Sequence, residues 1–231
     1  MLRIITTLLI VTSPVAVYSQ NDSSRSNTAR VDVVVTDMNG KPSRGEQILF
    51  KADESQKTVM GLSDAGGKFS VNLPVGDKYV IKVKSLTDTT KYGMISIPAL
   101  GADQYYSEPF KVNVKFEAAK KYTLDNVHFD FGKATLRTDS YGELEELVSY
   151  MKNKEEIKIE IAGHTDNIGK ADENLRLSQQ RADAIRAYVI RKGIAPARIV
   201  ARGYGATEPV ATNATEEGRQ LNRRTEVRVM Q

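Results

Sequence analysis

Residues 157–192 read IKIEIAGHTDNIGKADENLRLSQQRADAIRAYVIRK, and this stretch decides the fold of the C-terminal half of the chain. Isoleucines alternate with other residues from Ile157 to Ile161, which is typical of a strand with one buried face. From about Ala171 to Lys192 the apolar residues recur at helical spacing, and Gly193 suits a glycine C-cap. The sequence therefore predicts a strand, a polar loop and a long amphipathic helix. The helix is predicted to bury Leu175, Ala182, Ile185 and Val189.

The flanking segments extend this pattern into a complete domain over residues 118–231. Residues 139–152 have apolar positions at helical spacing after a polar start, which predicts a second amphipathic helix. Further strands are predicted at 122–129, 198–203 and 225–230. The order strand, helix, strand, helix, strand, strand favours two helices on one face of a mixed sheet, an α/β sandwich.

Before residue 118 the apolar residues alternate with a period of two. Short alternating runs are separated by turn residues such as Asn39-Gly40 and Asp64-Ala65-Gly66-Gly67. The predicted strands are 31–36, 47–52, 58–62, 68–73, 79–84, 93–97 and 110–116. We predict an antiparallel β-sandwich over residues 30–117, so the fold class of the whole chain is α+β.

The first residues are typical of a signal for export. Residues 1–19 place Arg3 before a short apolar run and end in small residues, so we predict a signal peptide cleaved after Ser19. The alternative is a leader retained as an anchor. Residues 20–29 are polar and are predicted to be a linker. After cleavage we expect no membrane span, and we predict a periplasmic or outer-membrane-associated protein.

The composition excludes several classes of function. The 231 residues carry 33 basic and 29 acidic side chains, and a net charge of +4 on so mixed a surface argues against nucleic-acid binding. The absence of cysteine excludes disulfides, thiolate metal sites, a cysteine nucleophile and lipid attachment through an N-terminal cysteine. His128 and His164 lack the spacing of a zinc site, and we predict no metal and no cofactor.

The densest polar cluster is the loop Gly163–Gly169, between the strand and the long helix. Such a junction offers unpaired backbone NH groups and short polar side chains to a ligand. Arg181 lies at the edge of the helix's apolar face, where an arginine has a defined partner. Together Asp166 and Arg181 could recognise the ammonium and carboxylate of an amino acid. Two alternatives stay open: the loop residues are only turn formers, or Asp166 and Arg181 form a simple salt bridge.

Several motifs in fixed order carry a family resemblance. They are residues 127–136, 163–169, 174–182, 203–209, 213–219 and 222–226. Together they resemble the OmpA-like peptidoglycan-binding domain over roughly residues 121–231. The resemblance implies that Asp166 and Arg181 grip the diaminopimelate residue of the cell-wall peptide.

Other site residues follow from the same resemblance. Asn174, near the first turn of the long helix, resembles a family ligand position, and Phe129, Asp130 and Arg224 are candidate rim contacts. Asp130 has the alternative of capping a turn. Arg223 and Arg224 have the alternative of a solvated charge pair before an edge-like strand.

Residues 62–83 resemble the carboxypeptidase-regulatory-like or prealbumin-like sandwich domains. That resemblance implies a fold and no chemistry, since the segment consists of turns and core alternation. Because the predicted mature chain lacks an anchor, the β-sandwich is the candidate for contact with an outer-membrane protein partner.

The resulting functional prediction is non-catalytic binding of peptidoglycan that tethers the envelope or a partner to the wall. One rival is an envelope adhesion protein acting mainly through the β-sandwich. The other is a periplasmic hydrolase using His164 and Ser178. A hydrolase is disfavoured because Ser178 should lie a turn or more along the helix from the loop, with no nucleophile elbow.

Overall fold

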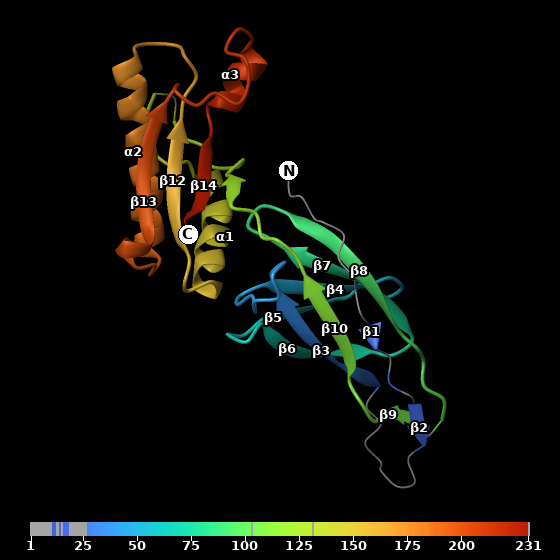
Figure 1. The fold of residues 1–231 in the computed structure, drawn as a ribbon. Helices are drawn as coiled ribbons and strands as arrows, with labels where there is room; N and C mark the ends of the chain where they lie inside the picture. The colour runs from blue at the N-terminus through green and yellow to red at the C-terminus, as the bar shows by residue number, and fades with distance from the viewer. Residues whose placement is uncertain are drawn as a thin grey trace. The chain divides into compact units, whose positions relative to one another are not determined.

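The computed structural model describes residues 11, 12, 14, 16–18, 27–102, 104–130 and 132–230. The chain forms two compact units, Met1–Ala119 and Lys120–Gln231 (Figure 1). None of the helices in the described ranges combines the length and apolarity needed to cross a bilayer.

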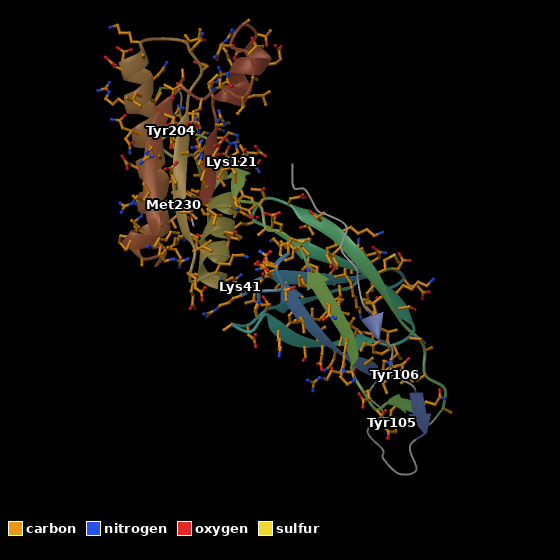
Figure 2. All side chains as sticks on the ribbon, viewed as in Figure 1. Lys41, Tyr105, Tyr106, Lys121, Tyr204 and Met230 are labelled. Carbon is orange, nitrogen blue, oxygen red and sulfur yellow. The ribbon has the colours of Figure 1, made fainter. Side chains whose placement is uncertain are left out.

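The N-terminal unit contains two four-stranded sheets and a small strand pair (Figure 1). The first sheet has the order β1 (Val11–Thr12), β10 (Phe110–Lys115), β3 (Thr28–Thr36), β6 (Lys68–Pro74). The second has the order β5 (Thr58–Leu62), β4 (Gln47–Ala52), β7 (Asp77–Lys84), β8 (Thr89–Ile97). The strand pair is β2 (Ala16–Tyr18) with β9 (Gln104–Tyr106). Figure 2 labels Tyr105 and Tyr106 on β9.

Side chains from both four-stranded sheets form one buried cluster. Alternate residues of β3, including Val31 and Val33, point into it from the first sheet. Phe50 of β4 and Ile81 of β7 enter it from the second sheet. Each such side chain contributes about 1.5–3 kcal/mol by leaving water, so the period of two in the sequence directly determines this core.

The strands depart from the prediction in three places. β10 runs parallel to β3, with Val112 opposite Val33, so the first sheet is not wholly antiparallel. A parallel pair needs a long connection, and the intervening strands of the second sheet provide it. β9 was not predicted, and β3 begins at Thr28, inside the segment predicted to be linker.

Most of the predicted signal peptide lies outside the described residues. The parts that are described are Pro14 and the two short strands β1 and β2, which pair with β10 and β9. The predicted cleavage site at Ser19 is also outside them. Export and cleavage therefore stay predictions.

The C-terminal unit has one four-stranded sheet with helices packed on it (Figure 1). Its strand order is β11 (Lys121–Thr123), β14 (Thr225–Met230), β12 (Lys158–His164), β13 (Ile199–Gly205). Its helices are α1 (Tyr141–Asn153), α2 (Ala171–Arg191) and α3 (Glu216–Asn222), with short 3-10 turns at Thr138–Ser140 and Pro196–Arg198. β12 pairs in parallel with β13 and antiparallel with β14, so the predicted mixed sheet is confirmed.

Three details of this unit differ from the prediction. Leu175 is 49% exposed because α2 turns Ser178, and not Leu175, towards the sheet. β11 is only three residues long, and the chain after it is held by Glu143, which accepts hydrogen bonds from the backbone NH groups of Asp125 and Asn126. α3 was not predicted; its start is capped by Thr215, whose hydroxyl accepts from Gly218 N at 3.1 Å.

Two glycines let α2 lie directly on the sheet. A Cβ on Gly163 of β12 would collide with the carbonyl oxygen of Ser178. A Cβ on Gly203 of β13 would collide with the backbone nitrogen of Gln179. Since backbone atoms cannot swing aside as a side chain can, the separation between helix and sheet depends on glycine at both positions.

We predict that Gly163→Ala destabilises the protein by about 1–3 kcal/mol because the added methyl group forces α2 away from β12. Gly142→Ala is the matched control: Gly142 lies in α1 with open space around it, and the change should stabilise by up to about 1 kcal/mol. Urea unfolding followed by circular dichroism measures both. A Gly163→Ala variant as stable as the wild type would contradict the packing argument.

Candidate functional site

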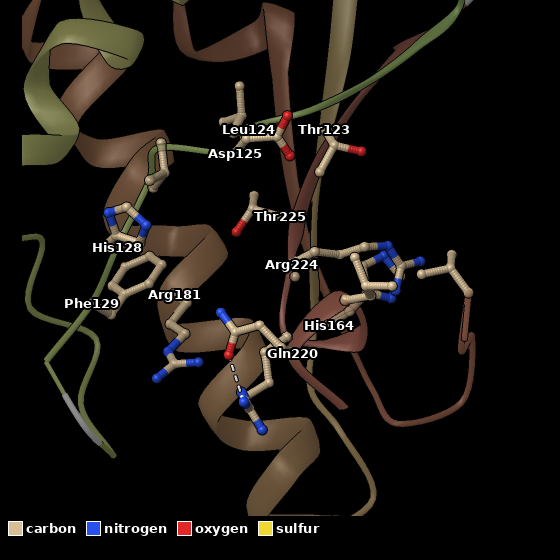
Figure 3. A pocket seen from close by; sticks show the side chains of 15 residues that line it. Thr123, Leu124, Asp125, His128, Phe129, His164, Arg181, Gln220, Arg224 and Thr225 are labelled. Carbon is tan, nitrogen blue, oxygen red and sulfur yellow. Dashed lines mark hydrogen bonds between the residues drawn. The ribbon is translucent and has the colours of Figure 1, made fainter. Parts of the chain in front are cut away.

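A cavity of about 330 Å³ opens within the C-terminal unit (Figure 3). It lies between the chain that follows β11, the end of β12, α2 and the segment from α3 to β14. The residues that line it are Thr123, Leu124, Asp125, Val127, His128, Phe129, Gly163, His164, Arg181, Val210, Gln220, Leu221, Arg223, Arg224 and Thr225. Three of the predicted site residues, Phe129, Arg181 and Arg224, are among them.

Arg181 is a partly buried cation that faces this cavity. Its guanidinium carbon lies 5.0 Å from the centre of the Phe129 ring, and Figure 3 shows the two side chains together. Its Nε donates to the carbonyl oxygen of Lys133 at 3.1 Å. Burial lowers the pKa of Arg181, the charge of Arg223 lowers it further, and Asp166 opposes both. Within the described residues no carboxylate forms an ion pair with Arg181, so it lacks a direct counter-ion.

Asp166 is paired with a different arginine. Its Oδ2 accepts from Arg223 Nη1 at 2.6 Å, and its Oδ1 accepts from the backbone NH of Ile168 at 3.0 Å. The alternative of a simple Asp166–Arg181 salt bridge is therefore wrong. The true partner was missed because Arg223 is 57 residues away in sequence.

Arg223 is held by several acceptors at once. Besides Asp166, it donates to Glu216 Oε1 at 2.6 Å and to Gln220 Oε1 at 2.5 Å, the dashed line in Figure 3. Hydrogen bonds to Glu216 and then Asp166 raise the pKa of Arg223. The alternative that Arg223 belongs to a solvated charge pair is wrong. Its guanidinium is held between the Asp166 loop and the side chains of α3.

Asn174 braces the loop from the first turn of α2. Its amide nitrogen donates to the carbonyl oxygens of Asp166 at 3.3 Å and Ile168 at 3.0 Å. The loop turns at Gly169, whose φ of +93° favours glycine. Asn174 and Asp166 do not line the described cavity; Asp166 reaches it through Arg223.

Phe129 and Asp130 lie on a segment tied to the start of α1. The hydroxyl of Ser140 accepts from His128 N at 2.8 Å and donates to His128 O at 3.0 Å. Asp130 closes a turn with its backbone, accepting from Lys133 N at 3.0 Å. Of these two candidate rim residues, the structure places Phe129 against Arg181 and leaves Asp130 off the described cavity wall.

Arg224 has a buried position, not a solvated one. Its side chain is 8% exposed, its Nε donates to Glu226 Oε1 at 2.8 Å, and its Nη2 donates to Glu208 O at 3.1 Å. The expected edge-like strand is wrong, because β14 lies between β11 and β12. Arg224, directly before β14, is therefore held beside the cavity by Glu226 and by the backbone at Glu208.

Glu226 is the centre of a buried charge cluster that the sequence analysis missed. Its carboxylate accepts from Lys121 Nζ at 3.2 Å, from Arg224, and from Arg228 Nη2 at 2.8 Å. His164 Nε2 lies 3.7 Å from Glu226 Oε2. Burial opposes ionisation, but hydrogen bonds from His164, Arg228 and Arg224 outweigh it and hold the pKa of Glu226 far below its usual range. The alternation Arg224, Glu226, Arg228 was the available signal, since such residues share one face of a strand.

The side chains considered for hydrolysis have other partners. The Ser178 hydroxyl donates to Leu175 O at 2.8 Å and accepts from Gly205 N at 2.9 Å. His164 stacks on Tyr204, with ring centres 5.2 Å apart. Neither side chain forms the nucleophile–base contact of a hydrolase, and the described residues contain no group of three or more metal-ligating side chains.

Comparison with known proteins identifies the domain. The model of the OmpA family matches residues 128–223. These residues form an OmpA-family domain. The chain is 46% identical over 104 residues to outer membrane porin F of Pseudomonas fluorescens, covering 45% of this chain and 32% of that protein.

Two other proteins match a similar share of this chain. Outer membrane protein A of Bordetella avium is 37% identical over 113 residues, which cover 49% of this chain and 58% of that protein. The solved peptidoglycan-associated lipoprotein of Burkholderia pseudomallei is 28% identical, with a TM-score of 0.43, over 48% of this chain and 91% of that one. The match to the two outer-membrane relatives spans only about a third to somewhat over half of their lengths.

Glu226→Gln should cost about 3–5 kcal/mol of stability at neutral pH because it leaves the buried Arg224 without a carboxylate and removes one of the carboxylates paired with Arg228. The pH dependence has a definite sign. Since the folded-state pKa of Glu226 is depressed, its contribution is complete above the unfolded-state pKa, about 4.3, and declines as the pH falls below it. The difference in unfolding free energy between wild type and variant should therefore shrink from pH 5 towards pH 2.

Urea unfolding at a series of pH values measures this difference. Glu217→Gln, an exposed change in α3, is the control and should follow the wild type at every pH. A gap between Glu226→Gln and wild type that stays constant with pH would contradict the assignment.

Proposed function

We propose that the OmpA-family domain binds peptidoglycan without catalysis, through the diaminopimelate residue of the peptide stem, and tethers the cell envelope or a partner protein to the wall. The observation that carries this proposal is the state of Arg181. It is a partly buried guanidinium at a cavity, with an aromatic ring against it and no carboxylate paired to it among the described residues. A charged group in that position is completed by an anionic ligand.

The geometry favours a carboxylate at Arg181. Its Nε is engaged with Lys133 O, which leaves the two Nη groups to donate to both oxygens of a carboxylate. Contact with the Phe129 ring limits the orientation of the guanidinium plane. A planar guanidinium held in one orientation is more selective for a carboxylate than the flexible ammonium group of a lysine would be.

The carboxylate of Asp166 close to Arg181 favours an amino-acid end over a simple anion. Arg181, Arg219 and Arg223 supply three positive charges, and Asp166 and Glu216 supply two negative ones, so these five side chains leave one positive charge. A group with one carboxylate and one ammonium can meet both Arg181 and Asp166, whereas a simple anion meets only the arginine. Diaminopimelate presents such a pair on one carbon, with its carboxylate at Arg181 and its ammonium near Asp166.

The remaining predicted residues have supporting roles in this proposal. Asn174 fixes the Asp166 loop, Phe129 orients Arg181, and Arg224 supports the cavity wall. Asp130 would contact only the outer part of a bound peptide. No metal or cofactor takes part.

The proposal also assigns roles in the cell envelope to the predicted signal peptide and to the N-terminal unit. Similarity to proteins named outer membrane porin F and outer membrane protein A supports export to the envelope by the predicted signal peptide. The two sheets of the N-terminal unit and their common core support a carboxypeptidase-regulatory-like β-sandwich. In this proposal that sandwich contacts an outer-membrane protein partner.

We expect Arg181→Ala and Asp166→Ala each to weaken wall binding by about 2–5 kcal/mol, because each leaves one charge of the ligand unpaired. Sedimentation with diaminopimelate-type sacculi measures the bound fraction. The matched control is Arg176→Ala, an exposed arginine on the same helix, which should sediment like the wild type.

Sacculi that carry lysine in place of diaminopimelate test the specificity. Lysine lacks the second carboxylate, so wild-type sedimentation should fall to the level of Arg181→Ala. Equal binding to both kinds of sacculi would remove diaminopimelate from the proposal, and a wild-type protein that stays in the supernatant with both would remove wall binding itself.

A further inference from the structure

The outer face of the sheet β5-β4-β7-β8 carries lysines beside exposed methionines. We define the lysine face as Lys51, Lys78, Lys82, Lys91, Met60 and Met94. Their side chains point away from the core because their strand neighbours, such as Phe50 and Ile81, point into it. We propose that the lysine face docks on an anionic phospholipid surface.

The strand register brings these side chains together. Met60, Leu49, Lys82 and Lys91 form one row across the four strands. Thr58, Lys51, Val80 and Met94 form the next row. Apolar and cationic groups therefore lie side by side in one continuous patch.

The charge of the face is not neutralised within the sheet. The strands β4, β5 and β8 contain no acidic residue. The one acidic residue of β7, Asp77, is buried and accepts from the backbone NH groups of Glu54 and Ser55. Across the described residues, none of the four lysines of the face forms an ion pair. The face thus presents four positive charges without a carboxylate partner among the described residues.

One feature of the register is unfavourable for the isolated protein. Lys82 and Lys91 lie directly opposite each other on neighbouring strands. Like charges in that position destabilise a sheet. A bound layer of anions would remove the repulsion, so the pair is suited to a charged partner.

The outer face of the other large sheet is also cationic, but among the described residues it has no large exposed apolar side chain. It carries Arg30, Lys68, Lys111 and Lys115 against the single carboxylate of Asp32. Arg30 Nε donates to Asp32 Oδ1 at 2.8 Å, and Ser70 donates to the same oxygen at 2.7 Å. This face therefore provides a cationic control surface without exposed methionines in the same unit.

The chemistry of the face favours lipid over an acidic protein. All of its cations are lysines, which act as flexible point charges and do not impose a bidentate geometry. Met60 is 56% exposed, Leu62 45% and Met94 43%, so large apolar groups stand among the ammonium groups. The phosphates of a phospholipid surface can bind the lysines, and its acyl chains can contact the apolar side chains. The aliphatic part of each lysine can lie along the neighbouring apolar side chains.

The experiment is vesicle sedimentation with protein purified from the envelope of the expressing cells. Phosphatidylcholine vesicles with and without phosphatidylglycerol are compared at low and high salt. We expect binding only to the anionic vesicles and its loss in high salt. Lys82→Gln combined with Lys91→Gln should weaken binding about 25-fold, since each lysine near an anionic surface contributes about five-fold. Lys68→Gln combined with Lys111→Gln removes the same charge from the outer face of the other sheet and should weaken binding less, because that face has no large exposed apolar side chain to anchor it on the lipid.

Two further measurements separate docking from loss of folding. Lys82→Gln with Lys91→Gln should raise the thermal unfolding midpoint by about one to a few degrees, because the like-charge pair is removed. Met60→Ser with Met94→Ser should weaken vesicle binding with the lysines intact. Sedimentation with sacculi should be unchanged by both pairs of substitutions, so failure of this proposal is distinguishable from failure of wall binding.

Several results would overturn the proposal. Equal binding to neutral and anionic vesicles would assign binding to apolar insertion elsewhere in the chain. Loss of sacculus binding in the lysine variant would make the wall polymer the occupant of the face. Retention on immobilised polyglutamate without any vesicle binding would make the occupant an acidic polypeptide.

Discussion

The close contact of α2 with β12 and β13 is the constraint on which the candidate site depends. Gly163 and Gly203 remove the side chains that would separate helix and sheet, and the backbone at Ser178 and Gln179 occupies the space. This contact fixes one end of the helix beside the loop that follows β12. Arg181 on the helix and Asp166 in the loop are therefore positioned by backbone packing, while their own charges play a smaller part.

Ion pairing then determines which side chains of the site already have a partner. Asp166 is paired with Arg223, which also donates hydrogen bonds to Glu216 and Gln220. Arg223 is kept in place by β14, where the next residue, Arg224, is bonded to Glu226 inside the sheet. The buried Glu226 cluster thus has a functional consequence: it fixes the strand whose first residues complete the site. Arg181 is left with the carbonyl oxygen of Lys133 and the Phe129 ring, without a paired carboxylate among the described residues, and the proposed ligand carboxylate would occupy that position.

Local patterns predicted the elements better than they predicted the partnerships. The periods of two and 3.6 located β4, β5 and β14 at the observed bounds and α2 to within one residue, because burial of one face determines both the pattern and the element. α3 escaped prediction because a seven-residue polar helix has little apolar periodicity, and only Thr215 marks its start. Leu175 was wrongly predicted to be buried. The sheet contacts the backbone of α2 at Ser178, so the small Ser178 is buried there and Leu175 is exposed.

The same limit applies to the site. Arg181 could be identified from its place at the edge of an apolar helix face, which is local information. The pairing of Asp166 with Arg223 and the parallel pairing of β3 with β10 join residues far apart in sequence, and no periodicity encodes such a choice. The Glu226 cluster lies between these cases: its alternating charges were visible, but alternation alone does not distinguish a buried charged face from a solvated one.

The two units present cations in physically different ways, and this difference separates their proposed partners. In the C-terminal unit the arginines of the candidate site are partly buried and are oriented by Phe129 or by carboxylates. In the N-terminal unit the four lysines of the lysine face form no ion pair among the described residues and are spread over a sheet face, so their attraction to anions is long-ranged and reduced by salt. A specific contact of the first kind and a diffuse contact of the second kind can be weak separately and strong together, because one chain joins them. Under the two proposals, one chain would contact the wall through its C-terminal unit and an anionic lipid surface through its N-terminal unit.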